Sequence, residues 1–196
     1  MENNSIKVVV VDVTSKCVVT GYVSHATNLH SFQGRISVGK AGESAWEQFC
    51  NDNGLEFEPV GYEHTNTPEE IAELKKRSDW AAKKIRHYPD VLVEGSKLVQ
   101  VKTAPSQPTP KYKAVTVEAD SFAVSCSLSA SGSPVLLVYV YGDGSIWGNW
   151  ISEIRAKEPY SQGHKTGSGT PFLLIDKKFL KPIENFVEDL VGVQNG

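Results

Sequence analysis

The chain has 196 residues and a mass of 21.4 kDa, which suits one domain with or without an appendage. With 40% hydrophobic and 22% charged residues, its composition argues against disorder and fibrous repeats. The formal net charge of −3 argues against a protein that coats nucleic acid by bulk charge. The sequence contains neither an apolar run long enough for a transmembrane helix nor a signal-peptide pattern, so we expect a cytoplasmic protein without a membrane partner.

The first third of the chain predicts a hairpin, a helix and a strand. Two β-branched segments within residues 6–23 favour a β-hairpin, and residues 24–38 are polar and irregular. A helix is predicted from about Gly39 to Asn53, where apolar residues recur at helical spacing. Residues 55–62 have the composition of a strand that Pro59 interrupts.

The middle of the chain begins with the strongest local signal. Thr67-Pro68-Glu69-Glu70 is a capping box with proline at the first helical position, so a helix begins there and continues toward Arg86. Ser78-Asp79 offers a point at which it splits in two. Two short strands follow at 91–94 and 97–102, and the prolines of Thr103–Pro110 indicate a loop.

The last third predicts a helix, three strands and a terminal helix. The helix is expected at 117–130, with Phe122, Ala123, Cys126 and Ala130 facing inward. A buried strand at 133–141 turns at Gly142-Asp143-Gly144 into a second strand, SIWGNWI. A strand at 171–176 and a helix at 182–191 complete the list. We interpret the chain as a single α/β domain with an N-terminal β extension (1–38), a core (39–151) and a C-terminal extension (152–196).

The net charge hides a strong asymmetry along the sequence. Residues 41–74 contain nine acidic residues and no Lys or Arg, whereas residues 75–113 contain ten basic and three acidic residues, a net charge of +7. Two solvated faces would explain this pattern, and so would a positive surface for a polyanion with carboxylates for a metal elsewhere.

The basic segment contains the pattern Pro89-Asp90, then Gln100-Val101-Lys102. Pro89 ends the preceding helix, so Asp90 begins a strand. Gln100 and Lys102 are two residues apart in the next strand, so both side chains point to one face. A three-residue loop or one bulge in the hairpin would pair Asp90 with Lys102 and bring all three together. A regular two-residue turn would put Asp90 on the other face, and we predict the first arrangement.

These residue types suit metal-assisted phosphoryl chemistry. Carboxylate and amide oxygens at strand ends are ligands that a hard cation such as Mg²⁺ prefers. A lysine on the same face can orient a water molecule and offset charge on a phosphoryl transition state.

The order of helix, strand, strand opening with Pro-Asp, strand with Gln-x-Lys, helix and strand resembles the PD-(D/E)XK nuclease superfamily. The resemblance covers residues 39–150 and includes Gly42-Glu43 in the first helix. It implies a restriction-endonuclease-like αβββαβ core, a mixed central sheet flanked by helices, with the N-terminal β-hairpin added. Gln100 departs from the usual acidic residue, as in the Gln-x-Lys variant of Mrr-like nucleases.

The resemblance also implies roles for individual residues. Asp90 would be the central metal ligand, joined by Gln100, the Val101 carbonyl and Glu43, with Glu47 as the competitor of Glu43. Lys102 would position the attacking water. The cofactor would be Mg²⁺, with Mn²⁺ able to substitute.

The function implied is a metal-dependent DNA endonuclease. A structure-specific enzyme similar to Holliday junction resolvases is favoured over a restriction- or Mrr-like nuclease domain, and a catalytically inactive DNA-binding module is the rival from another class. We expect a homodimer that acts on duplex or branched DNA, in recombination or repair, in the cytoplasm of a prokaryotic or virus-infected cell. The candidate DNA contacts are Lys83, Lys84, Arg86, Lys111 and Lys113. Trp147 and Trp150 are expected to pack rather than to stack on bases.

Overall fold

The computed structural model of the protein describes residues 5–12, 17–24, 32–104, 113–156, 160–162 and 171–192, with side chains described from residue 39 onward except at 160–162. Among these residues, no helix is both long and apolar enough to span a membrane. The N-terminal hairpin is present as predicted: β1 (Ser5–Asp12) pairs antiparallel with β2 (Cys17–Ser24) in a two-stranded sheet of its own.

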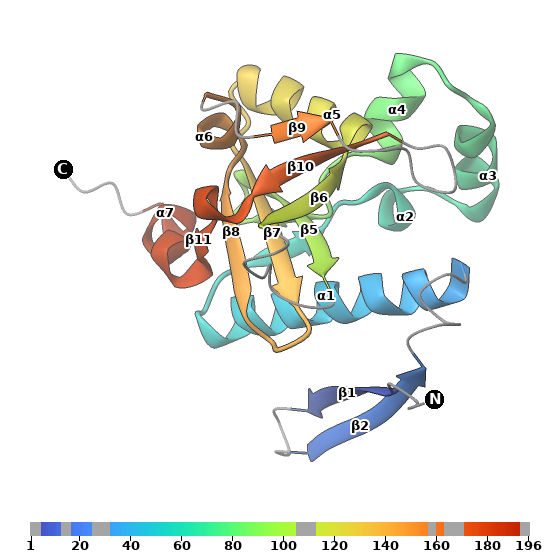
Figure 1. The fold of residues 1–196 in the computed structure, drawn as a ribbon. Coiled ribbons are helices and arrows are strands. Elements are labelled where there is room, and N and C mark those ends of the chain that lie inside the picture. Colours follow the sequence, from blue (N-terminus) through green and yellow to red (C-terminus); the bar gives the residue numbers. More distant parts are fainter. Residues whose placement is uncertain are drawn as a thin grey trace.

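A six-stranded mixed sheet forms the centre of the fold (Figure 1). Its order is β11 (Lys181–Pro182), β8 (Ile146–Trp150), β7 (Val135–Tyr141), β5 (Lys97–Ala104), β4 (Val91–Val93) and β3 (Phe57–Pro59). The β5–β7 pair is parallel and the other neighbours are antiparallel. All seven residues of β7 are buried, as its continuous apolar run predicted, because both faces of the sheet are covered.

Helix α1 (Phe32–Asp52) runs along one face of this sheet (Figure 1). Trp46 and Cys50 of α1 are fully buried against Val99 and Val101 of β5 and against β7. The 3₁₀ helix η2 (Ile183–Phe186) and helix α7 (Val187–Val191) complete this core with Ile183, Phe186 and Leu190. The C-terminal part of the chain therefore contributes to the core that positions β5.

The opposite face is covered by helices and a second, smaller sheet. This sheet has the order β6 (Ala114–Glu118), β10 (Phe172–Asp176) and β9 (Tyr160–Gln162), all antiparallel. Helices α5 (Ala119–Ala130) and α6 (Ile151–Ala156) lie on the same side, and η1 (Lys177–Phe179) follows β10. Phe122, Ile154 and Ile175 are buried there against Leu137 and Tyr139 of β7.

Between β3 and β4 the chain inserts three short helices: α2 (Tyr62–Thr65), α3 (Pro68–Lys76) and α4 (Trp80–Arg86). The capping box at Thr67 is formed in both directions with Glu70, as predicted. The helix splits at the predicted point, because the Asp79 carboxylate accepts a hydrogen bond from Ala82 N–H and begins a new helix.

The order α1, β3, β4, β5, α5, β7 is the αβββαβ order expected from the sequence, with α2–α4 inserted. Among the details that differ from the predictions, three concern residues 32–130; α6, β9 and β11 were also not predicted. Helix α1 begins at Phe32 rather than Gly39, because extending a formed helix costs little even across Gly34 and Gly39. β6 was missed because it pairs with β10, far along the chain. Ala123 and Ala130 are exposed, and the small side chains of Ser121 and Ser125 are buried instead.

Candidate functional site

The β4–β5 hairpin decides where Asp90 lies. The pairs Val91↔Val99 and Val93↔Lys97 leave Glu94-Gly95-Ser96 as a three-residue loop, in which Glu94 and Gly95 have φ values of 49° and 59°. The same register carried one residue further puts Asp90 opposite Gln100. The predicted three-residue loop is confirmed, but the predicted pairing with Lys102 is wrong, because the loop begins at Glu94 rather than Gly95. Asp90, Gln100 and Lys102 still share one face.

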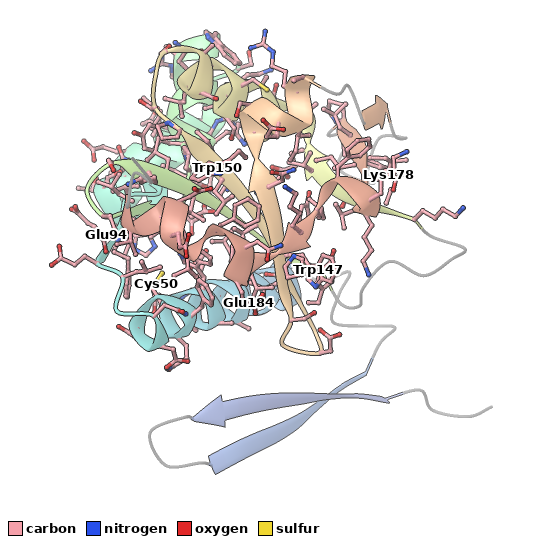
Figure 2. All side chains as sticks on the ribbon, turned by 90° about the vertical axis from the view of Figure 1, so that its left-hand side faces the viewer. Cys50, Glu94, Trp147, Trp150, Lys178 and Glu184 are labelled. Carbon is pink, nitrogen blue, oxygen red and sulfur yellow. The ribbon has the colours of Figure 1, made fainter. Side chains whose placement is uncertain are left out.

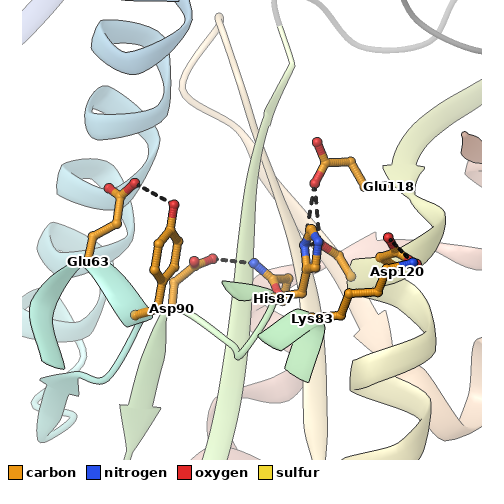
Figure 3. Close-up of polar contacts among 9 residues, drawn as sticks. Glu63, Lys83, His87, Asp90, Glu118 and Asp120 are labelled. Atoms are coloured by element: carbon orange, nitrogen blue, oxygen red, sulfur yellow. Dashed lines mark hydrogen bonds and ion pairs between the residues drawn. The ribbon is translucent and has the colours of Figure 1, made fainter. Parts of the chain in front are cut away.

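The Asp90 carboxylate accepts a backbone hydrogen bond from β5 that a neighbouring strand would otherwise accept. Its Oδ2 accepts a hydrogen bond from the Gln100 side-chain Nε2 at 2.6 Å and another from the Val101 backbone N–H at 2.7 Å. The Asp90 main chain is held as well, since its carbonyl accepts from Val60 N–H and Gly61 N–H at 2.9 and 3.1 Å. In Figure 3 a dashed line runs from the Asp90 carboxylate to a side-chain nitrogen, which is the bond from Gln100. These contacts fix Asp90 against β5.

Gln100 has a buried oxygen that no hydrogen bond satisfies. The residue is only 3% exposed, and its Oε1 has no hydrogen-bond partner among the described residues. An unsatisfied buried acceptor of this kind costs about 1–3 kcal/mol, so it calls for an explanation. This Oε1 atom belongs to the same Gln100 amide group whose Nε2 donates to Asp90.

Glycine 42 allows α1 to approach this site closely. A Cβ added to Gly42 would overlap Thr103 Oγ1 on β5, whereas one added to Gly39, a turn earlier, would meet nothing within 4 Å. The next residue, Glu43, is partly buried. Burial and the neighbouring charge of Asp90 raise the pKa of the Glu43 carboxyl. The close contact of helix and strand therefore sets Glu43 near Asp90, as the sequence order implied.

Lys102 is the cationic neighbour of Asp90. Burial raises the pKa of the Asp90 carboxyl, and the charge of Lys102, together with the Val101 and Gln100 hydrogen bonds, opposes that rise without reversing it. The protein interior thus disfavours the ionised form of Asp90. A bound cation would relieve this cost.

Glu63 is a site neighbour that the sequence reasoning missed. It lies on α2, next to Tyr62, whose hydroxyl donates to Glu63 Oε1 at 3.1 Å (Figure 3). Its charge contributes to the raised pKa values of both Asp90 and Glu43. No motif marks it, because its position follows from the hydrogen bond between Gly61 N–H and the Asp90 carbonyl, which is a tertiary contact.

On the α5 side of Asp90 lies a second polar group centred on His87 (Figure 3). His87 Nδ1 is 3.0 Å from Ser121 Oγ and 3.7 Å from Glu118 Oε2. Burial lowers the pKa of His87, and the charge of Lys102 acts in the same direction. The ring is thus anchored by Ser121, and its charged form is disfavoured, so it is not a free surface residue.

The predicted DNA contacts that the structure describes differ in exposure and in pairing. Lys83 forms an ion pair with Asp120 at 3.1 Å, so its charge is already matched within the protein. Lys84 is exposed on α4, and Arg86 is partly buried, with no hydrogen-bond partner for its Nε in the described part of the chain. Lys113 is exposed at the start of β6, the end opposite Glu118. Lys111 lies outside the described residues.

A cleft of about 650 Å³ lies at the other end of the sheet, around β8, η2 and α7, where Figure 2 labels Trp150 and Glu184. Glu153, Glu184, Glu188 and Asp189 line it together with a single base, Lys181. This charge does not suit a polyanion. Trp150 is packed edge-on against Phe186 and Trp147 lies under Lys177, so both tryptophans have the packing roles expected.

The described residues contain no group of three or more His, Cys, Asp or Glu side chains placed to hold a metal ion. The oxygen donors near Asp90 are of other kinds: its carboxylate, the orphaned amide oxygen of Gln100, and main-chain carbonyls of β5. The N–H and C=O of one residue in an extended strand point to the same side, so the Val101 carbonyl faces Asp90 as its N–H does. This set suits a cation that keeps several water ligands, as Mg²⁺ does.

Comparison by sequence found no matching family model and no matching curated protein. Comparison of the fold found the solved structure of D212, a nuclease from a fusselovirus. The two chains are 9% identical, with a TM-score of 0.46 over 88% of this chain and 96% of the other. The likeness concerns the overall fold alone.

Proposed function

We propose that this protein is a metal-dependent DNA endonuclease that hydrolyses phosphodiester bonds at Asp90. The observation that carries the proposal is the buried Gln100 oxygen without a partner, beside a carboxylate that the protein interior disfavours. Both features cost folding free energy, and one bound cation would offset both. Costly polar arrangements of this kind are typical of functional sites.

Mg²⁺ is the cation that fits these residues best. Asp90, the Gln100 amide oxygen and the Val101 carbonyl would hold it, with Glu43 behind them, and substrate phosphate would supply a further ligand. When bound, Mg²⁺ polarises a phosphoryl oxygen and neutralises charge that develops on it. Gln100 contributes no charge, so we expect weaker metal binding than a second carboxylate would give.

The chain's own residues supply positioning and charge. Lys102 shares the face of Asp90 and Gln100, so its ammonium group can orient a water molecule and stabilise the negative transition state. The two hydrogen bonds to Asp90 Oδ2 hold the carboxylate against β5. The raised pKa of Glu43 makes it suited to exchange a proton near the site.

We further propose that the substrate is branched DNA, as for Holliday junction resolvases, with a restriction- or Mrr-like activity on linear duplex as the alternative. The support comes from size and charge: a small core, and the basic residues of α4, which precede Asp90 in the chain. Cutting both arms of a junction needs two sites, so we expect a symmetric dimer.

A cleavage assay tests the proposal. Purified protein is incubated with supercoiled plasmid, single strands, and flapped and four-way substrates, with EDTA, Mg²⁺ or Mn²⁺. We expect metal-dependent cutting that Asp90→Ala abolishes. Lys102→Ala should also lose cutting while it keeps a Mg²⁺-dependent shift in melting temperature, because Lys102 is not a metal ligand.

The alternative to an enzyme is a catalytically inactive module that has the nuclease fold and only binds nucleic acid. It predicts no cutting of any substrate with either metal, and unchanged DNA binding in the Asp90→Ala variant. That pair of results would remove the enzyme proposal.

A further inference from the structure

Helix α4 presents apolar side chains that the described part of the chain covers only in part. Of the large apolar side chains in the described residues, three are exposed: Trp80 (44%), Ile85 (41%) and Val191 (47%). Two of these lie on α4, a helix of seven residues. Lys84, four residues after Trp80, extends over the Trp80 ring with its Nζ 5.9 Å from the ring centre.

The opposite face of α4 is tied to the protein. Ala82 is fully buried, and Lys83 forms its ion pair with Asp120 at the start of α5. The start of the helix is fixed by Asp79, which caps Ala82 N–H and holds Arg77 through hydrogen bonds of 2.8 and 2.9 Å. The exposed Trp80 is therefore presented by a helix that is anchored at its start and along its other side.

The charge around Trp80 identifies the kind of partner. Helix α4 contains three basic residues and no acidic one. A protein partner would have to desolvate the Lys84 ammonium on the ring, and lysine is depleted from the buried centres of protein interfaces. A nucleic acid would meet the ammonium with phosphate and the indole with a base, the combination that single-strand binding surfaces use.

We infer that Trp80 is a stacking platform for an unpaired base of the nucleic acid that enters the site at Asp90. A base inside an intact duplex has both faces covered, so this contact selects substrates with single-stranded or branched segments. The inference rests on the proposed function and deepens it by naming the feature of the substrate that is recognised.

The distance along the chain is consistent with one substrate reaching both residues. From Trp80 to Arg86 the helix rises about 9 Å, and the four steps on to Asp90 span at most about 14 Å. The separation of roughly 23 Å or less corresponds to about seven nucleotide steps of a duplex strand. A strand contacting Asp90 can therefore place an unpaired base at Trp80.

The test measures binding in EDTA, so that it needs no cleavage and remains valid if the protein proves not to be a nuclease. A single-stranded oligo(dT) and a blunt duplex of equal length are titrated against the wild type, Trp80→Ala, Trp80→Phe and Ile85→Ala. Intrinsic tryptophan fluorescence and anisotropy of a labelled oligonucleotide report the binding. Ile85→Ala is the matched control, because it removes exposed apolar surface from the same helix without removing an aromatic ring.

We expect oligo(dT) to quench the tryptophan emission of the wild type and not that of Trp80→Ala. The Trp80→Ala substitution should weaken oligo(dT) binding by about 5- to 150-fold, the range for loss of one stacked base, and should weaken duplex binding less. Trp80→Phe should keep most of the affinity, and Ile85→Ala should stay within about twofold of the wild type. Equal binding by Trp80→Ala and the wild type overturns the inference. It is also overturned if the protein is a dimer that Trp80→Ala and Ile85→Ala both dissociate, because the face then belongs to a second copy.

Discussion

Replacing Asp90 with Asn should stabilise the protein in EDTA and remove its response to Mg²⁺. Burial raises the pKa of Asp90, which means that the fold disfavours its ionised form. The favourable contacts from Lys102, Val101 and Gln100 already act on that pKa and do not reverse its direction. A neutral side chain of the same shape therefore removes a cost at neutral pH.

The size of the effect depends on how far the fold raises the pKa of Asp90. Both hydrogen bonds to the carboxylate go to one oxygen, Oδ2, and an Asn oxygen in that position can accept both, from Val101 N–H and from Gln100 Nε2. The gain is therefore the removal of the disfavoured charge, about 1.4 kcal/mol for each unit by which the pKa is raised. At roughly 2–4 °C for each kcal/mol in a chain of this size, each such unit should raise the melting temperature by about 3–6 °C.

The pH dependence has a defined sign. Asp90 and Glu43 both have pKa values raised above their ordinary 3.8 and 4.5. The stability linked to each is fully present below the ordinary value and is lost as the pH rises through the raised folded value. In EDTA the variant Asp90→Asn should therefore gain stability relative to the wild type as the pH rises above about 4. Mg²⁺ at ten times its Kd should restore about 1.4 kcal/mol to the wild type alone.

Differential scanning fluorimetry with EDTA or Mg²⁺, across pH, measures these shifts. The matched control is Asp52→Asn, since Asp52 is an exposed carboxylate on α1 that accepts a bond from Gln48 at 2.7 Å. It should change stability by no more than about 0.5 kcal/mol in either condition. The reasoning is refuted if Asp90→Asn is no more stable than the wild type in EDTA, or if it keeps the wild-type Mg²⁺ shift.

Two further substitutions test the metal ligand and the helix that positions Glu43. Gln100→Glu should lower stability in EDTA, because it replaces the 2.6 Å hydrogen bond with two adjacent carboxylates. It should also enlarge the rise in melting temperature that Mg²⁺ produces. An unchanged Mg²⁺ titration would show that Gln100 is not a metal ligand. Gly42→Ala should cost about 1–3 kcal/mol and reduce cleavage, because its Cβ would overlap Thr103 Oγ1, whereas Gly39→Ala should be neutral or stabilising by up to about 1 kcal/mol. Adding Thr103→Ala to Gly42→Ala should recover most of the loss in a double-mutant cycle, and purely additive effects would show that the two residues are not in contact.

The elements that local chemistry determines were predictable from the sequence. The capping box at Thr67, the break at Asp79, the buried run of β7 and the turn after Tyr141 each depend on a few adjacent residues. The faces of Gln100 and Lys102 follow from the two-residue period of a strand. The start of α1 and the strand β6 were not predictable in this way, since one depends on extension of a helix already formed and the other on pairing with β10.

The candidate site likewise has some features that local sequence predicts and others that depend on tertiary packing. The sequence by itself determined that Gln100 and Lys102 share a strand face, because the two-residue alternation of a strand suffices for that, and the three-residue loop that adds Asp90 to this face was a prediction that the structure confirms. Only the tertiary structure decided that Asp90 lies opposite Gln100, that Gln100 Oε1 is buried without a partner, and that Glu63 is a neighbour. Burial and charge proximity depend on how α1, α2 and β5 pack together. No local pattern contains that information, and these are the properties from which the chemistry of the site was inferred.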